Sequence, residues 1–479
     1  MNKSTDVQNR LAAVLGAAAA LWLVLVAQVF FVHDDYMYVT SAALLPQYGL
    51  YTEILYLQMP LLIWLQSAVL GALSAGAGGY QALVSLNIFF VLAACYLALA
   101  TVRSRSPVVW LAVWLAMLGS FAVIMTAGAV SNHALQLLLG ACLLRLCLGG
   151  SVTTGRAMAA GLLCGLMIAC KLNSLPFLLP LLVWLLQGAR FFKHAAYAAL
   201  GGFLALLPVL LLFMQDPAAF WYANVTAPLL NNDLRGASST VELTIKLLRQ
   251  FIMPSVLVLM LYTAFVCIMA MFAVVSRRLW LWGSFLLAAA GAALLPGKVF
   301  DFHFALLLLV ACAAAGDMLG VQLNSLAPLL RQRLILFLWP MILLGALDLG
   351  TSGIMKNAPA KSITLEYIAD AYRQALAKQA VCAPSVFSTA AIPALAGPLP
   401  VHPASASGPF VMRLDPEKVI GEVLAARSAV LTGYHADMQY EQVLVAALDE
   451  QHYTALQLGT YKLGERAAAW VLWLPRCYA

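Results

Sequence analysis

The chain has 479 residues, of which 63% are hydrophobic and only 10% are charged. Its mean hydropathy of +0.90 excludes a soluble globular protein, in which roughly a quarter of the residues are charged. The net charge of +7 does not indicate a nucleic-acid-binding protein, because the basic residues are scattered over many short segments between apolar runs. We therefore expect a polytopic α-helical membrane protein.

The N-terminal segment is predicted to be a retained membrane span. MNKSTDVQNR is followed by about 20 apolar residues, a run too long for the core of a signal peptide, and it lacks a clear small-residue cleavage site. Comparable runs recur as far as Leu349, and each is long enough to cross about 30 Å of hydrocarbon.

Clusters of basic residues predict the orientation of these spans, because cytoplasmic loops are rich in Lys and Arg. If every cluster lies in the cytoplasm, an even number of crossings separates successive clusters. About eleven spans satisfy this condition, with a cytoplasmic N-terminus and an external C-terminus: 11–31, 80–102, 107–127, 132–149, 157–170, 175–189, 196–214, 252–274, 280–295, 303–320 and 334–350. The apolar stretch 60–75 is then no full crossing, and we expect an interfacial or re-entrant helix there.

This topology gathers unusual polar residues on the external face: His33, Asp34, Asp35, Glu53, Asn132, His133, Lys171, Lys298, Asp301 and His303. Several have ordinary explanations. Lys171 could be a snorkelling lysine at a helix end, His303 could be an interface histidine with satisfied hydrogen bonds, and Asn132 could be a helix N-cap. Asp34 and Asp35 are harder to explain in this way, because adjacent carboxylates at an apolar boundary are costly unless they are exposed, paired or functional.

The distribution of acidic residues predicts a domain boundary near residue 350, since ten of the 20 acids lie in the last 129 residues. We expect a transmembrane domain over 1–350 and an external α/β domain over 351–479. Helices are predicted at 362–379, 415–428 and 439–451, and strands at 429–434, 453–461 and 467–475. Cys382 and Cys477 are the only cysteines of this part, so a disulfide in an oxidising compartment is a hypothesis.

The segment HDDYMYVTSAALLPQYGLYTE, followed by QMPLLIW, resembles the first external loop of the GT-C superfamily of integral membrane glycosyltransferases. That superfamily includes protein mannosyltransferases, the lipid A aminoarabinose transferase and RgtA/B/C/D-like bacterial enzymes. The matching positions are Asp34, Asp35, Tyr38, Gly49, Tyr51, Pro60 and Leu61. The glycine-rich span that ends at Lys171 and the segment LPGKVFDFHF, which contains Lys298 and His303, are similar to later motifs of the family.

Three positions depart from the family pattern. Asp35 replaces the Glu of the usual D-E pair, and Met59 replaces the first proline of P-P. Asn132 stands where the family often has a second acid, which puts in doubt any metal site built on that acid. No cofactor is therefore certain, and a divalent metal stays open.

The resemblance implies transfer of a sugar from a polyprenyl-phosphate donor to an acceptor at the external face, generally with inversion. Asp34 is then the candidate general base and Asp35 orients it or binds the acceptor. Cations would stabilise the leaving phosphate: Lys171, Lys298 and Arg235, with His303 as a hydrogen-bond donor or metal ligand and Arg249 in reserve. Tyr38, Glu53, Asn132 and Asp301 are the candidate substrate-binding residues.

The segment 216–250 is too long to be a simple turn. Trp221 and Tyr222 fit an aromatic belt, and Asn231, Asn232 and Asp233 are candidates to touch a sugar. Asn224 begins an N-V-T sequon, which alone is a common chance match.

The implied partners are a lipid-linked sugar donor, a glycan, lipid or protein acceptor and the bilayer of a bacterial inner membrane, but no nucleic acid. Two other classes stay open. A transporter or flippase of lipid-linked sugars would also be polytopic, although ionisable residues at mid-span and internal repeats are expected there. A non-catalytic membrane scaffold with an external binding domain is the other.

Overall fold

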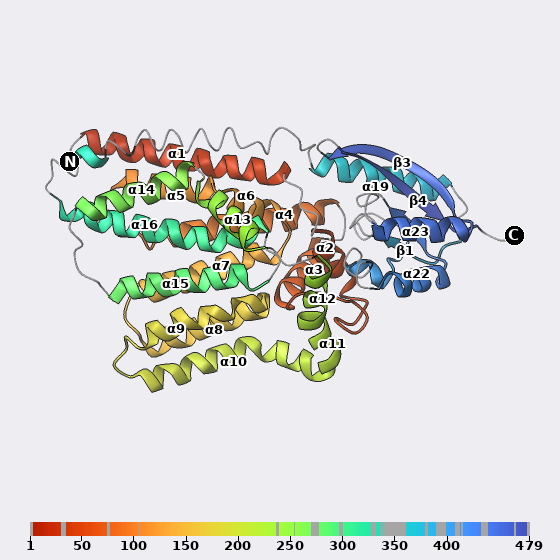
Figure 1. Cartoon of the computed structure of the whole chain (residues 1–479), viewed down its shortest axis with the longest axis horizontal. Coiled ribbons are helices and arrows are strands. Elements are labelled where there is room, and N and C mark those ends of the chain that lie inside the picture. Colours follow the sequence, from red (N-terminus) through yellow and green to blue (C-terminus); the bar gives the residue numbers. More distant parts are fainter. Residues whose placement is uncertain are drawn as a thin grey trace.

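The computed structural model describes residues 3–29, 35–73, 77–104, 106–235, 239–252, 254–269, 277–296, 300–326, 332–335, 338, 361–378, 382–388, 399–407, 412, 415–432, 439–463 and 466–476. A bundle of long helices occupies one end of the molecule and a small mixed α/β unit the other (Figure 1). Short helices from the segments 35–73 and 217–235 lie between these two parts (Figure 1).

The helices of the bundle follow the apolar runs of the sequence: α1 (Lys3–Val29), α4 (Ala77–Leu99), α5 (Pro107–Leu118), α6 (Phe121–Gly128), α7 (Asn132–Leu148), α8 (Thr154–Cys170), α9 (Leu178–Leu185), α10 (Phe191–Gln215), α14 (Pro254–Met269), α15 (Arg277–Leu294) and α16 (Ala305–Ser325). Among the described residues, four helices are long and apolar enough to cross a membrane alone. The predicted last span, 334–350, lies almost wholly outside the described residues.

One predicted span is not a single helix. The predicted span 107–127 consists of two helices, because α5 ends at Leu118 and α6 begins at Phe121, with a bend of 62° between them. Gly119 and Ser120 form the break, and the backbone of Ser120 is extended. A glycine next to a serine is a usual place for a sharp helix kink.

Small residues fix the position of α8, the helix that carries a candidate site residue at its end. A Cβ atom at Gly161 would collide with the carbonyl of Ala198 on α10, and one at Gly201 would collide with the carbonyl of Met158 on α8. Close backbone approach at small residues is the usual way in which membrane helices pack. This packing sets where α8 ends and therefore where Lys171 lies.

The segment 35–73, which the sequence predicts to be external and which is called the first external segment below, contains α2 (Asp35–Leu44) and α3 (Leu61–Leu73). At 13 residues, α3 is among the shorter apolar helices, as expected for the stretch 60–75. The segment 216–250 is helical rather than a loop: α11 (Pro217–Trp221), the π-helical turn η2 (Tyr222–Thr226), α12 (Ala227–Arg235) and α13 (Thr240–Ile252).

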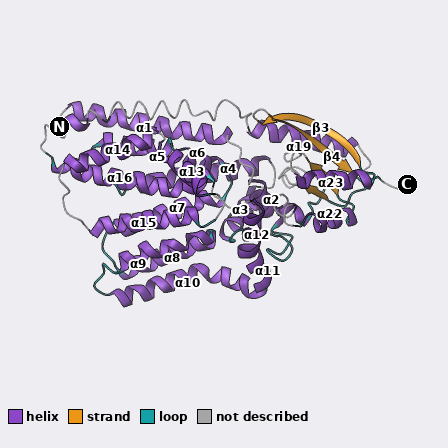
Figure 2. Ribbon diagram, in the orientation of Figure 1, coloured by secondary structure: helices purple, strands orange, loops and turns teal. Residues whose placement is uncertain are grey.

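The C-terminal unit contains α19 (Lys361–Lys378), β1 (Val386–Ser388), η5 (Pro403–Ser407), α22 (Pro416–Ala425), β2 (Ala429–Thr432), α23 (Gln439–Glu450), β3 (Thr454–Leu463) and β4 (Arg466–Leu474). Its four-stranded sheet has the order β1-β2-β4-β3, with a parallel β1-β2 pair and antiparallel pairs elsewhere. Figure 2 shows β3 and β4 in this unit beside the helices α19, α22 and α23. The predicted helices and strands of this part are all present. The strand β1 was not predicted.

Two contacts tie this unit together and to the rest of the chain. The Ser41 hydroxyl on α2 donates a hydrogen bond of 3.0 Å to the Ala406 carbonyl in η5. Cys382 is disulfide-bonded, and its Sγ lies 3.7 Å from the carbonyl oxygen of Pro475. Cys477, its predicted partner, lies outside the described residues.

Candidate active site

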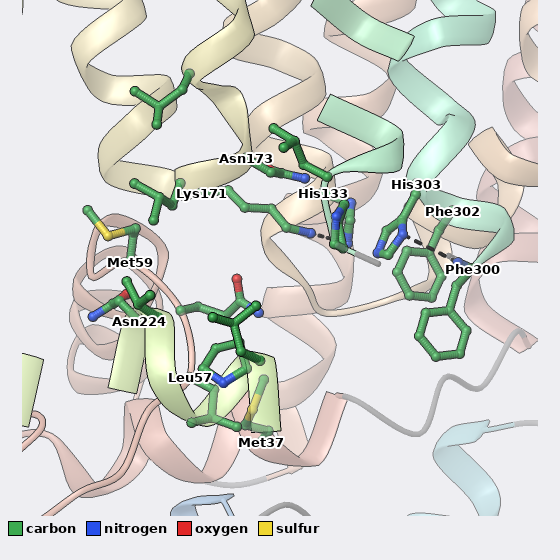
Figure 3. A pocket seen from close by; sticks show the side chains of 18 of the residues that line it. Met37, Leu57, Met59, His133, Lys171, Asn173, Asn224, Phe300, Phe302 and His303 are labelled. Carbon is green, nitrogen blue, oxygen red and sulfur yellow. Dashed lines mark hydrogen bonds between the residues drawn. The ribbon is translucent and has the colours of Figure 1, made fainter. Parts of the chain in front are cut away.

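A cavity of about 390 Å³ opens where the helix ends meet the first external segment (Figure 3). This volume is within the range of about 300–1,000 Å³ that small-molecule sites occupy. Its lining combines apolar side chains with a few polar ones: Met37, Tyr38, Leu57, Gln58, Met59, His133, Lys171, Leu172, Asn173, Leu175, Asn224, Val225, Pro228, Leu229, Leu295, Pro296, Phe300, Phe302 and His303.

A lysine and a histidine from neighbouring helices meet at this cavity. Lys171 directly follows α8, where the extended backbone (φ −159°, ψ 124°) ends the helix. Its Nζ lies 2.8 Å from Nε2 of His133 in the first turn of α7, and only 7% of Lys171 and 8% of His133 are exposed. A lysine ammonium can only donate hydrogen bonds, so Nε2 of His133 accepts and the imidazole is neutral. Figure 3 shows the lysine side chain extending toward this ring.

His303 lies beside this pair. The short helix η3 (Asp301–Phe304) carries it, and the Phe300 amide donates a hydrogen bond of 3.3 Å to its Nδ1. In the neutral ring the proton is therefore on Nε2, which is the donor. The centroids of the His133 and His303 rings are 5.1 Å apart, and the Phe302 ring lies 4.6 Å from that of His133. The two histidines and Lys171 thus form one cluster at the cavity, called the cationic cluster below.

Asn132 connects the first external segment to the bundle. Its Oδ1 accepts a hydrogen bond of 3.1 Å from the Tyr38 hydroxyl, and its Nδ2 donates one of 3.0 Å to Oε1 of Gln58. The interpretation of Asn132 as an N-cap is wrong, because the cap position of α7 is Ser131 and Asn132 is already helical. The side chain is instead committed to holding Tyr38 and Gln58 at the cavity wall.

Two other predicted substrate-binding acids have different positions. Oε2 of Glu53 accepts a hydrogen bond of 2.6 Å from the Gly49 amide and closes the turn that precedes α3. Glu53 and Asp301, the first residue of η3, are not among the described residues that line the cavity.

Several predicted residues fall where the structure describes no side chain. Asp34 and Lys298 lie outside the described residues, as do parts of the segments around them. Asp35 begins α2 and Arg235 ends α12, and only their backbone is described. Their proposed roles therefore stay predictions from the sequence.

Several cavity residues received no role from the sequence: Gln58, His133, Asn173, Asn224, Phe300 and Phe302. Topology had put His133 on the external face, and the polar pair Asn132-His133 at the start of an apolar helix was a signal for it. Gln58 and Asn224 carried no such signal. Among the described residues, no group of three or more His, Cys, Asp or Glu side chains is placed to hold a metal ion.

Residues 60–297 match the family model named Glycosyltransferase family 87. The match covers 238 of the 479 residues, just under half of the chain. The matched range includes α3 and both members of the Lys171–His133 pair, while His303 lies just beyond it. The predicted resemblance to membrane glycosyltransferases is thereby confirmed.

The fold of this chain is similar to folds of known structure. The crystal structure of ArnT from Cupriavidus metallidurans bound to undecaprenyl phosphate matches with a TM-score of 0.62 at 12% identity, covering 96% of this chain and 97% of that one. The apo structure of the same protein matches with a TM-score of 0.59 at 13% identity, with the same coverage. No curated protein matches the chain significantly. A polytopic, mostly helical GT-C-like fold with a small C-terminal sheet is confirmed.

Proposed function

We propose that the protein transfers a sugar from a polyprenyl-phosphate donor to an acceptor hydroxyl at the external face of the membrane, with inversion. The observation that carries this proposal is the cationic cluster: a buried ammonium held by a neutral histidine at the wall of a cavity, in a glycosyltransferase fold. The similar fold of ArnT, which was crystallised with undecaprenyl phosphate, supports a lipid phosphate as the donor's carrier.

Lys171 would stabilise the phosphate as it leaves. In the transfer, the acceptor oxygen bonds to the anomeric carbon while the bond from that carbon to the phosphate oxygen breaks, and the electron pair departs with the phosphate. Negative charge therefore develops at the phosphate, where an ammonium in a site of low polarity is most effective. His133 keeps the ammonium in place, and the Nε2 proton of His303 adds a neutral donor.

A carboxylate must take the proton of the acceptor hydroxyl as it attacks. Asp34 is the proposed base, with Asp35 orienting it. Met37 and Tyr38, which follow these acids on α2, line the cavity. The hydrogen bond from Tyr38 to Asn132 fixes this end of α2 relative to α7 and so to the cationic cluster.

The remaining parts of the proposal concern location. We propose a bacterial inner membrane with the N-terminus in the cytoplasm, and an external α/β domain over 351–479. The external segments and the C-terminal unit lie at the end of the bundle where the cavity opens (Figures 1 and 3). An acceptor could approach from that side, while the prenyl chain would lie along the helices.

The first test is transfer of radiolabelled sugar from undecaprenyl-phosphate-linked donors by the purified protein in liposomes. Asp34→Asn should lower the rate by about 10²- to 10⁴-fold, the usual contribution of a general base. Asp370→Asn, which changes an exposed acid paired with Arg373 on α19, is the matched control and should leave the rate unchanged. Full activity of Asp34→Asn would remove Asp34 from the role of base.

A further inference from the structure

The cavity has a second polar region, on the side away from the cationic cluster. Figure 3 shows Asn224 with Met59 there, well apart from His303 and Phe300. Asn224 lies in η2, a π-helical turn over Tyr222–Thr226. Such turns are rare and occur frequently at functional sites.

Of the two polar side-chain atoms of Asn224, only one forms a hydrogen bond within the described part of the chain. Its Nδ2 donates a hydrogen bond of 3.0 Å to the Phe220 carbonyl and also contacts the Tyr51 phenol. Its Oδ1 is buried and accepts no hydrogen bond within the described part of the chain. An unsatisfied buried acceptor costs about 1–3 kcal/mol, and Asn224 lines the cavity, so a ligand group that donates to this oxygen would recover that free energy.

Tyr51 places Gln58 next to this acceptor. Its phenol donates a hydrogen bond of 2.7 Å to the Gln58 carbonyl, and its ring packs edge-on against Phe220 at 5.1 Å. Burial raises the pKa of Tyr51, and the contact with Asn224 opposes this only in part, so the phenol stays a donor at neutral pH. Tyr51 has a φ of 71°, in the left-handed region. Such strain in a residue other than glycine persists where the surrounding structure holds it.

Gln58 supplies the complementary group. Its Oε1 accepts a hydrogen bond from Asn132, and its Nε2 is a further donor group. Asn224 on η2 and Gln58 on the first external segment line the same cavity. A sugar hydroxyl both donates and accepts hydrogen bonds, so this pair suits the hydroxyl groups of a sugar. The apolar neighbours Met59, Val225 and Pro228 suit the C–H groups of its ring.

We propose that Asn224 and Gln58 form a subsite that binds hydroxyl groups of the donor's sugar, opposite the phosphate held by Lys171. This inference rests on the proposed function, because it takes the donor to be a glycosylated lipid phosphate. It assigns the recognition of the sugar to η2 and the first external segment, and the recognition of the phosphate to the ends of α7 and α8. Because Asn224 is partly buried and its amide nitrogen is engaged, it is a cavity residue rather than a glycosylation acceptor.

The test compares two dissociation constants in detergent: that of bare undecaprenyl phosphate and that of undecaprenyl phosphate carrying mannose, glucose or arabinose. The wild type should bind at least one glycosylated lipid more tightly than the bare lipid. Asn224→Ala should reduce this preference about three- to tenfold, the worth of one hydrogen bond, with little change for the bare lipid. Asn324→Ala, an exposed amide at the other end of α16, is the matched control and should change neither value.

Asn224→Asp distinguishes the role of the side-chain oxygen from that of the amide nitrogen, whose hydrogen bond to the Phe220 carbonyl also stabilises η2. It keeps an acceptor at the position of Oδ1 and should retain the preference that Asn224→Ala loses. The inference is overturned if Asn224→Ala keeps the wild-type preference, if Asn224→Asp loses it as fully as Asn224→Ala, or if the wild type prefers no glycosylated lipid of the panel. Failure of the wild type to bind the bare lipid would instead contradict the proposed function.

Discussion

The two ends of the helix bundle each hold a buried charged cluster, and the clusters differ in how their charges are satisfied. At one end, the Asp317 carboxylate on α16 accepts six hydrogen bonds from Arg103, Arg278 and Trp282. At the other end, the Lys171 ammonium contacts a neutral histidine beside a cavity. The two clusters lie about 20 Å apart along η3 and α16, because His303 and Asp317 are 14 residues apart in sequence and a helix rises about 1.5 Å per residue.

We interpret the Asp317 cluster as structural and the cationic cluster as functional. The cluster around Asp317 joins the end of α4 to α15 and α16, and Arg278 also donates to the carbonyls of Thr101 and Leu148. A charge satisfied on every side by the protein has no capacity left for a ligand. The cationic cluster instead lies at the wall of a cavity that is lined by further polar side chains. Each of the predictions that follow tests one side of this contrast.

The largest expected effect is on stability, at the Asp317 cluster. Asp317→Ala should lower the free energy of unfolding by about 3 kcal/mol, because removing one partner leaves buried charge uncompensated. Arg103 is half exposed and Arg278 is not, so the cost arises mainly at Arg278. Thermal unfolding in detergent measures the change, with Asp370→Asn as a surface-pair control that should unfold like the wild type. Unchanged stability of Asp317→Ala would show that the cluster does not join the helices.

The next effect is on catalysis. His133→Leu removes the acceptor for Lys171 and should raise the KM for the lipid-linked donor about tenfold or more, the worth of a charge-assisted hydrogen bond. His133→Gln offers an amide oxygen in its place and should recover most of the loss. A purely structural histidine would lower the melting temperature in both variants and leave KM unchanged, which would refute the positioning role.

The smallest effect concerns pH and the C-terminal unit. Burial lowers the pKa of His402, and Glu422 opposes this only in part. The folded state then binds fewer protons than the unfolded state, so the stability contributed by neutral His402 is present above its unfolded pKa of about 6.5 and is lost as the pH falls below it. The loss should be below about 1 kcal/mol.

His402→Asn isolates this effect. The asparagine can still accept from the Ala404 amide, which donates to Nδ1 of His402 at 3.3 Å, but it does not titrate. The melting temperature of the wild type should therefore fall more between pH 7.5 and pH 5 than that of His402→Asn. Parallel curves for the two proteins would refute the role of His402.

The helices and strands that depend on contacts between residues close together in the chain could be predicted from local patterns in the sequence. The helix after Asp415 was predictable because that side chain accepts from the Lys418 amide as an N-cap, and β3 and β4 were predictable from their apolar runs. The strand β1 has only three residues, all buried, and so offers no alternation to recognise. The bend at Gly119–Ser120 was missed because the whole run from 107 to 127 is apolar.

The site could be predicted only in part, because some of its contacts depend on how the helices pack. Topology could place Lys171 and His303 on one face, and both line the cavity. It could not show that His133 lies 2.8 Å from Lys171, because that contact depends on how α7 and α8 pack. Nor could it give Asn224 a role, since the π-helical geometry and the orphaned oxygen of that residue have no signature in the sequence.

A structure of the protein bound to undecaprenyl phosphate tests the central claim most directly. The phosphate should lie in the cavity with an oxygen about 2.7–3.2 Å from Nζ of Lys171, and the Lys171→Met variant, with a side chain of similar length and no charge, should lose this binding while keeping its melting temperature. A phosphate bound elsewhere, or held equally well by Lys171→Met, would contradict the account.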